Sequence, residues 1–91
     1  MSKHKDLFQK VAELERQQES YVIATVFKVQ GSSSGRVGDK ALFDKNGDRI
    51  LGYIGGGCIE NRVASTAKET LSEGNPKIVE IGPKNGSKKG P

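Results

Sequence analysis

The chain contains one motif whose residue types and spacing could do chemistry. Three consecutive glycines are followed by a cysteine and, two positions later, by a glutamate, in Gly55-Gly56-Gly57-Cys58-Ile59-Glu60. The motif joins a predicted strand to a predicted helix that begins at about Cys58. The first amides of a helix lack intrahelical partners, the helix dipole favours negative charge there, and glycines let a ligand come close to the backbone. The motif therefore predicts an anion-binding site.

The cysteine of this motif gains further candidate roles from its position. A helix N-terminus favours the thiolate, so Cys58 is a candidate nucleophile or soft-metal ligand. Glu60, in the first helical turn, is a candidate cap, local base or simply an anion that suits this helix end. A purely structural interpretation stays open for both features. It makes the glycines a tight strand-to-helix connection and Cys58 a small buried hydrophobe.

A second glycine-rich stretch follows the first predicted strand and has the sequence Gly31-Ser32-Ser33-Ser34-Gly35-Arg36-Val37-Gly38. Its hydroxyls, its amides and the Arg36 guanidinium are donors that suit an oxyanion. The serines are poor candidate nucleophiles, because the single histidine, His4, lies in a terminus expected to fray and no other base is evident. Neither stretch has the spacing of a P-loop or of a dinucleotide-binding fingerprint.

The elements that must position these motifs follow from periodicity. Apolar residues spaced by three and four predict a helix over residues 6–18. A β-branched and aromatic run over residues 21–29 predicts a strand inside the sheet. Strands at 40–44 and 49–54 form a predicted hairpin around Asn46-Gly47.

The second half of the chain completes the predicted fold. A helix runs from about Cys58 until Gly74-Asn75-Pro76 stops it, and residues 77–81 form a final strand. The order α-β-β-β-α-β predicts a single α+β domain, with a mixed sheet of about four strands and the two helices packed on it. Because each glycine-rich stretch follows a strand, we expect the two to lie at the same edge of the sheet.

Composition limits the class of protein. With 91 residues, of which 33% are apolar, we expect one domain over residues 1–83 with a small core. One cysteine and one histidine exclude a disulfide framework and a self-contained Cys/His zinc site. No apolar run approaches the roughly 18 residues of a membrane span, and no signal peptide is evident, so we expect a cytoplasmic protein. Most of the net charge of +4 falls in residues 75–91, and we predict a disordered basic tail over 84–91 rather than a nucleic-acid arm.

The two glycine motifs, in this order, resemble the N-terminal domain of the XdhC/CoxI family over about residues 21–81. That family comprises accessory proteins of molybdenum hydroxylases such as xanthine dehydrogenase and carbon monoxide dehydrogenase. The resemblance implies a domain that binds the molybdenum cofactor, a molybdopterin carrying a phosphate. The domain would protect the cofactor while its terminal sulfur is installed and then assist its insertion into the apo-enzyme.

The resemblance also implies site residues and partners. Gly31, Ser32, Ser33 and Gly38 match the family's first motif, and Gly56, Gly57, Cys58 and Glu60 match its second. Arg36 and Gly55 join them as candidate cofactor-binding residues, and Cys58 is the candidate metal ligand. Full-length family members carry a second, Rossmann-like domain, so a separately encoded domain of that kind is an expected partner beside the apo-enzyme. A core this small would also gain stability from a homodimer.

Three functions compete. The favoured one is a cofactor-handling domain that holds molybdenum cofactor without catalysis. The alternative is a non-catalytic interaction module that recruits a molybdoenzyme or a Rossmann-domain partner and does not itself bind the cofactor. A thiol-dependent enzyme centred on Cys58 is the least favoured, because the sequence positions no histidine beside it.

Overall fold

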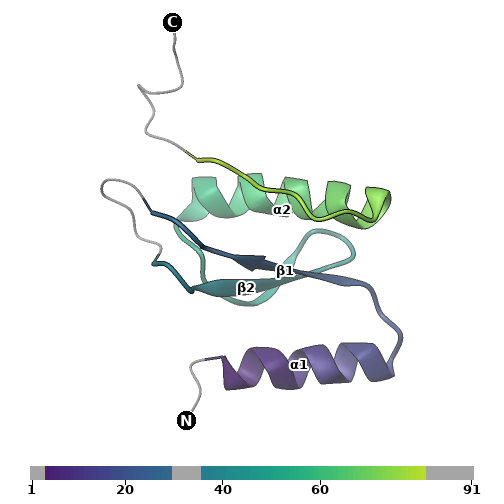
Figure 1. Cartoon of the computed structure of the whole chain (residues 1–91). Helices are drawn as coiled ribbons and strands as arrows, with labels where there is room; N and C mark the ends of the chain where they lie inside the picture. Colours follow the sequence, from purple (N-terminus) through teal and green to yellow (C-terminus); the bar gives the residue numbers. More distant parts are fainter. Residues whose placement is uncertain (1–3, 30–35, 82–91) are drawn as a thin grey trace, which may run out of the picture.

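The computed structural model describes residues 4–29 and 36–81. In this part of the chain the elements are α1 (Lys5–Arg16), β1 (Tyr21–Thr25), β2 (Lys40–Asp44), β3 (Arg49–Gly52) and α2 (Gly57–Glu73). The two helices lie on opposite faces of the sheet, so the molecule has three layers (Figure 1). The α+β class and both helices were predicted from the sequence, and both are confirmed.

The sheet has the order β1-β2-β3, and both neighbouring pairs are antiparallel. The predicted hairpin between β2 and β3 is confirmed. Its turn is closed by Asp44, whose Oδ1 accepts hydrogen bonds from the N–H groups of Asn46 and Asp48 at 2.8 and 3.0 Å. Gly47 has a φ of +83°, which explains why the turn needs glycine at this position.

The predicted place of the first strand in the sheet was wrong. β1 spans Tyr21–Thr25 rather than residues 21–29, and in the described part of the chain it lies at an edge of the sheet instead of inside it. Its apolar residues on both faces have another cause. Tyr21 packs towards the α1 side of the sheet, and Val22 and Ala24 pack into the cluster on the α2 side. Because a helix covers each face of the sheet, this edge strand has apolar residues on both faces, as a central strand does.

The predicted fourth strand and mixed sheet are not observed. Residues 77–81 have no strand structure, and no backbone–backbone hydrogen bond between described residues joins them to the sheet. A β-branched segment becomes a strand only when a neighbour accepts its amides, and local sequence does not supply that neighbour. At the start of the segment, Lys77 instead forms an ion pair with Glu73 in the last turn of α2, at 2.7 Å. The predicted tail at 84–91 and the domain limit at 83 lie outside the described residues.

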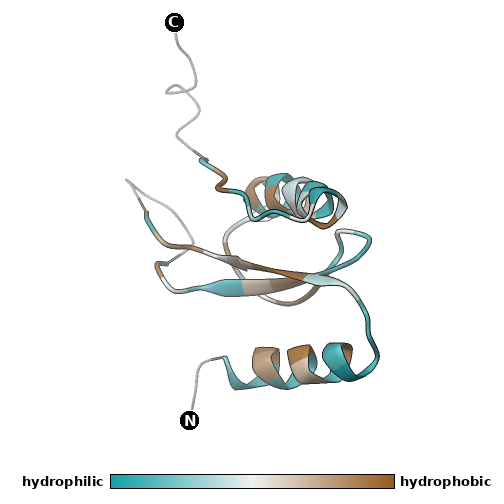
Figure 2. Cartoon of the chain, turned by 45° about the vertical axis from the view of Figure 1, so that its right-hand side comes forward, coloured by the Kyte–Doolittle hydropathy of each residue, from teal (hydrophilic) through white to brown (hydrophobic). Residues whose placement is uncertain are grey.

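The core consists of two clusters that share β2. Towards α2, Phe43 packs with Ala41, Ile54 and Ala67. Towards α1, Leu42 packs with the buried leucines of the helix, Leu7 and Leu14. Figure 2 shows this arrangement as brown, apolar stretches of the sheet between the two helices. Burial of apolar area on both faces of one short strand is therefore the main source of stability.

A polar contact fixes α1 against the sheet. The Tyr21 hydroxyl donates a hydrogen bond to the Glu15 carboxylate near the end of the helix. This hydrogen bond raises the pKa of Tyr21, because deprotonation would place two negative charges side by side.

Neither described helix is long and apolar enough to cross a membrane.

We expect the substitution Phe43→Ala to lower the free energy of unfolding by about 3–5 kcal/mol, because it removes a fully buried ring and leaves a cavity. The matched control is Phe27→Ala, at a side chain that is 65% exposed, for which we expect a change within about 0.5 kcal/mol. Urea denaturation followed by circular dichroism measures both. Similar losses in the two variants would contradict the two-cluster core.

Candidate functional site

The two glycine-rich stretches follow strands that end on the same side of the sheet, and this side is called the shared edge below. β1 and β3 are both antiparallel to β2, so they run parallel to each other and end on the same side (Figure 1). Lys40, the first residue of β2, lies between their ends. Its carbonyl oxygen accepts a hydrogen bond from the Tyr53 N–H at 3.0 Å, and its Nζ donates one to Thr25 Oγ1 at 3.1 Å. The shared edge expected from the sequence is thus present in the described residues.

The glycine-rich stretch that precedes β2 ends in a tight turn held by Asp39. Its buried carboxylate accepts a hydrogen bond from the Arg36 N–H at 2.9 Å, and its own N–H donates to the Arg36 carbonyl at 2.9 Å. Gly38 within the turn has a φ of +95°. Of the predicted site residues in this stretch, Arg36 and Gly38 are therefore at the edge, whereas Gly31, Ser32 and Ser33 lie outside the described residues.

The expectation that His4 lies in a frayed terminus was wrong. Its Nε2 is 3.0 Å from the Gly38 carbonyl oxygen, and its ring meets the Phe8 ring edge-on, with centroids 6.4 Å apart. The start of α1 is thereby attached to the turn that precedes β2. His4 binds the backbone of the glycine-rich stretch, which sequence spacing could not indicate because 34 positions separate the two residues.

The glycines between the end of β3 and the start of α2 divide into two kinds. Gly52 and Gly55 have φ angles of +96° and +142°, and a Cβ at Gly52 would lie 2.3 Å from the Lys40 carbonyl oxygen. These two glycines are required by the turn itself. A Cβ at Gly57 would meet nothing within 4 Å, and no positive φ calls for glycine there. Gly56 is the N-cap of α2 and has no side chain with which to accept its first amides. The structural interpretation therefore explains Gly55 but does not explain why positions 56 and 57 are glycines.

Cys58 is the second residue of α2 and is exposed. The interpretation of this residue as a small buried hydrophobe was therefore wrong. The described residues contain no group of three His, Cys, Asp or Glu side chains that could hold a metal ion. Within that part of the chain, Cys58 could contact a metal only as one ligand beside others that the bound molecule itself supplies.

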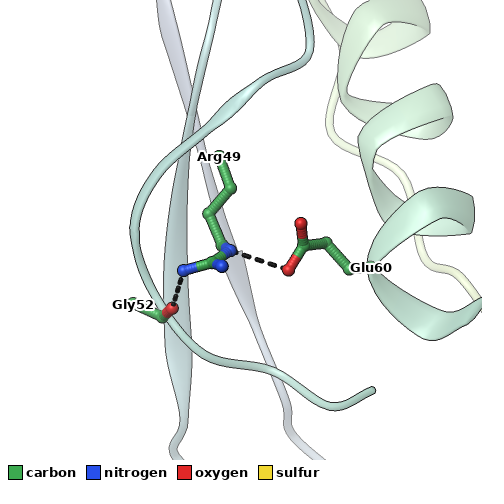
Figure 3. A network of polar contacts seen from close by, with 3 residues as sticks. All are labelled: Arg49, Gly52 and Glu60. Carbon is green, nitrogen blue, oxygen red and sulfur yellow. Dashed lines mark hydrogen bonds and ion pairs between the residues drawn. The ribbon is translucent and has the colours of Figure 1, made fainter. Parts of the chain in front are cut away.

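Glu60 is held by Arg49, a residue that sequence analysis did not single out. Figure 3 shows the Arg49 guanidinium between the Glu60 carboxylate and the Gly52 carbonyl oxygen. Nε donates to Glu60 Oε1 at 2.7 Å, and Nη1 donates to the Gly52 oxygen at 2.7 Å. The contact ties β3 to the first turn of α2 across the glycine run. Glu60 thus has a positioning partner, which argues against its use as a local base.

The edge offers an open surface rather than an enclosed cavity. A hollow of about 260 Å³ reaches it through Lys40 and Gly52 and extends towards His4. A second hollow, of about 310 Å³, lies between α1 and the hairpin turn, away from the glycine run. Neither of these two hollows is lined by residues 55–60.

Comparison with known proteins gives one family match that covers most of the chain. Residues 14–82 match the sequence model of the XdhC and CoxI family. A 46-residue stretch is 46% identical to a protein of Bacillus subtilis (strain 168) that is named as a probable xanthine dehydrogenase subunit. That stretch is 50% of this chain and 14% of the relative, so the match covers a small part of the relative's length. No solved structure gives a significant match.

Two glycine substitutions separate the structural from the open positions. We expect Gly52→Ala to destabilise the fold by at least about 1–3 kcal/mol, because its positive φ and the Lys40 carbonyl oxygen both exclude a Cβ. We expect Gly57→Ala to leave stability unchanged or to raise it by up to about 1 kcal/mol, since alanine favours a helix over glycine. Urea denaturation measures both, and a destabilising Gly57→Ala would contradict the open position.

A double-mutant cycle tests the contact between Arg49 and Glu60. We expect Arg49→Met and Glu60→Gln to show a coupling of about 0.5 kcal/mol at low salt, because side chains exposed by 38% and 31% are partly screened by water. The coupling should fall as salt is added. Arg62→Gln, at an exposed arginine of α2, is the control and should show no coupling with Glu60→Gln. Absence of coupling for Arg49 at low salt would refute its positioning role.

Proposed function

The chain belongs to the XdhC and CoxI family, and from this premise we propose that it is an accessory domain for a molybdoenzyme and holds the molybdenum cofactor at the edge formed by its two glycine-rich stretches. The observation that carries the proposal is the start of α2. Gly57 is open, Cys58 is exposed and the N-cap has no side chain. All three lie at the edge where the other glycine-rich stretch ends. The relative named as a probable xanthine dehydrogenase subunit supports the choice of client.

The chemistry of the edge suits an anionic, sulfur-rich cargo. The free amides of Gly57 and Cys58 at the helix N-terminus are donors for a phosphate oxygen. Arg36 supplies a positive charge from the neighbouring stretch. The exposed Cys58 sulfur would be a soft ligand for molybdenum, and the remaining metal ligands would be the cofactor's own sulfur atoms.

The other predicted residues take supporting roles. Gly38 and Gly55 shape the two turns through their positive φ angles. Glu60 contributes through Arg49, which fixes the first turn of α2 to β3. Gly31, Ser32 and Ser33 are assigned to the cofactor by their match to the family's first motif.

The proposed domain holds its cargo and does not transform it. Nucleophilic catalysis by Cys58 would need a base within hydrogen-bond reach. Glu60 is bound by Arg49, and His4 is bound to the Gly38 carbonyl. We place this function in the cytoplasm, where a single free cysteine remains reduced.

An interaction module is the second candidate, and the exposed apolar side chains favour it. Phe27 follows β1, Val37 precedes β2 and Tyr53 follows β3, and these side chains are 65%, 62% and 48% exposed. All three positions belong to the edge that carries the glycine motifs. Exposed aromatic residues around a polar site are typical of surfaces that bind another protein. The apo-enzyme or a Rossmann-like partner would then contact the domain at these side chains, and the domain itself would not bind the cofactor.

A charge variant tests cofactor binding without harming the fold. Gly57→Glu places a carboxylate in open space at a helix N-terminus, where it suits the dipole but repels an anion. We expect it to weaken binding of molybdenum cofactor, released from a purified molybdoenzyme under anaerobic conditions, by about tenfold or more. Gly57→Gln is the neutral control of the same size and should weaken binding less. Cys58→Ser should weaken it through loss of the soft ligand.

The pattern of results distinguishes the two functions. Unchanged binding in both Gly57→Glu and Cys58→Ser would remove the site assignment. Absence of cofactor binding, together with co-purification of a molybdoenzyme that is lost in Phe27→Ser, would favour the interaction module.

A further inference from the structure

Among the described residues, no strand pairs with the outer side of β1, so this edge of the sheet is open to a further strand. Val26 N–H donates to the Asp39 carbonyl, so the amides that bond β2 belong to Val26 and to the residues alternating with it, Ala24 and Val22. In an antiparallel ladder the intervening residues then direct their amide and carbonyl groups outward. In β1 these are Tyr21, Ile23 and Thr25. The strand carries no charged side chain over its whole length and has a regular register, so nothing in its sequence discourages pairing.

β3 forms the opposite edge of the sheet, and its features discourage the addition of a strand. β3 is only four residues long, and its register against β2 is interrupted between Leu42 and Phe43. Arg49 at the start of β3 donates to the carbonyl oxygen of Gly52 at its end. Short length, an irregular register and a charged side chain on the edge are features that prevent strand addition. A strand that joins this sheet would therefore do so at β1.

The chain itself supplies a segment of suitable direction. α2 packs on the β1 side through Ala67, Ala64 and Val63, in the cluster that contains Val22 and Ala24. After Gly74 the chain turns back along α2 (Figure 1), so residues 77–81 run opposite to the helix. A strand, a helix over the sheet and a returning segment form the connection that joins parallel strands. Because β3 and β1 are parallel, the returning segment has the direction of β1.

The composition of residues 77–81 suits a strand beside β1. Ile78, Val79 and Ile81 are β-branched, and β-branched residues favour strands. Ile78 is 74% exposed and Ile81 is 42% exposed, so both have apolar surface to bury. The Lys77–Glu73 ion pair holds the start of the segment to the end of α2 and leaves the apolar residues after it unpaired in the described structure.

We propose that residues 77–81 dock along the open edge of β1 as a fourth strand, parallel to it. Attachment through α2 gives this segment a high effective concentration at the edge, which favours it over a second copy of the chain. Docking places Ile81 on the side of the sheet where β1 and β3 end, beside the two glycine-rich stretches. Whatever polypeptide follows in a longer relative would then enter next to the candidate site. The proposal does not depend on which ligand that site binds.

Adjacent proline substitutions in the full-length chain give the test. Neighbouring amides of a strand point to opposite sides, so only one of Ile78→Pro and Val79→Pro removes an N–H that faces β1. We expect one variant to speed amide hydrogen exchange at Ile23 or Thr25 by about tenfold and the other to change it little. The Ala24 amide, which bonds β2, is the internal control and should stay protected in both. Nuclear Overhauser contacts between Val79 and Ile23 or Thr25 in the unmodified protein provide a second measurement.

Three results would overturn the proposal. The first is rapid exchange of the Ile23 and Thr25 amides in the unmodified protein, which would mean that the edge is uncovered. The second is protection that neither proline alters. The third is protection that is lost on dilution together with a fall in apparent mass, which would assign the edge to a second copy.

Discussion

Burial of β2 between two helices is the constraint on which the rest of the structure depends. Ala41, Leu42 and Phe43 are fully removed from solvent, and their side chains alternate between the α2 and α1 layers. A chain of this size buries little apolar surface elsewhere, so a short strand must anchor both layers. The positions of β1 and β3 follow, because each pairs with one side of β2.

The position of the candidate site is a consequence of this pairing. Two strands antiparallel to a common neighbour must end on the same side, and here each is followed by a glycine-rich stretch. Lys40 starts the central strand at that edge and bonds residues from both sides. The start of α2, where an anion-binding site is predicted, and the Arg36 turn are thus brought together by topology, although no sequence motif spans both.

Between β3 and α2, the glycines that the backbone conformation requires differ from the glycine that leaves the helix start open. Gly52 and Gly55 are needed for backbone conformations that other residues rarely adopt. Gly57 has no such need and leaves the helix start accessible. Arg49 holds this arrangement by bonding Gly52 and Glu60 at once, so it connects the end of β3 with the first turn of α2. A rigid strand on one side and an anchored helix on the other keep the open amides in place.

The sequence by itself determined the features that depend on neighbours in the chain. Apolar periodicity located α1 and α2, and Asn46-Gly47 located the hairpin. The two glycine motifs indicated the family over about residues 21–81, and the family match over residues 14–82 confirmed it. The tertiary structure alone decided which strand lies at an edge, that His4 reaches Gly38 and that Arg49 binds Glu60. The physical reason is the separation along the chain over which each kind of interaction acts. Helix and turn signals act over a few residues, whereas strand order and long-range polar contacts depend on which surfaces the packed core brings together.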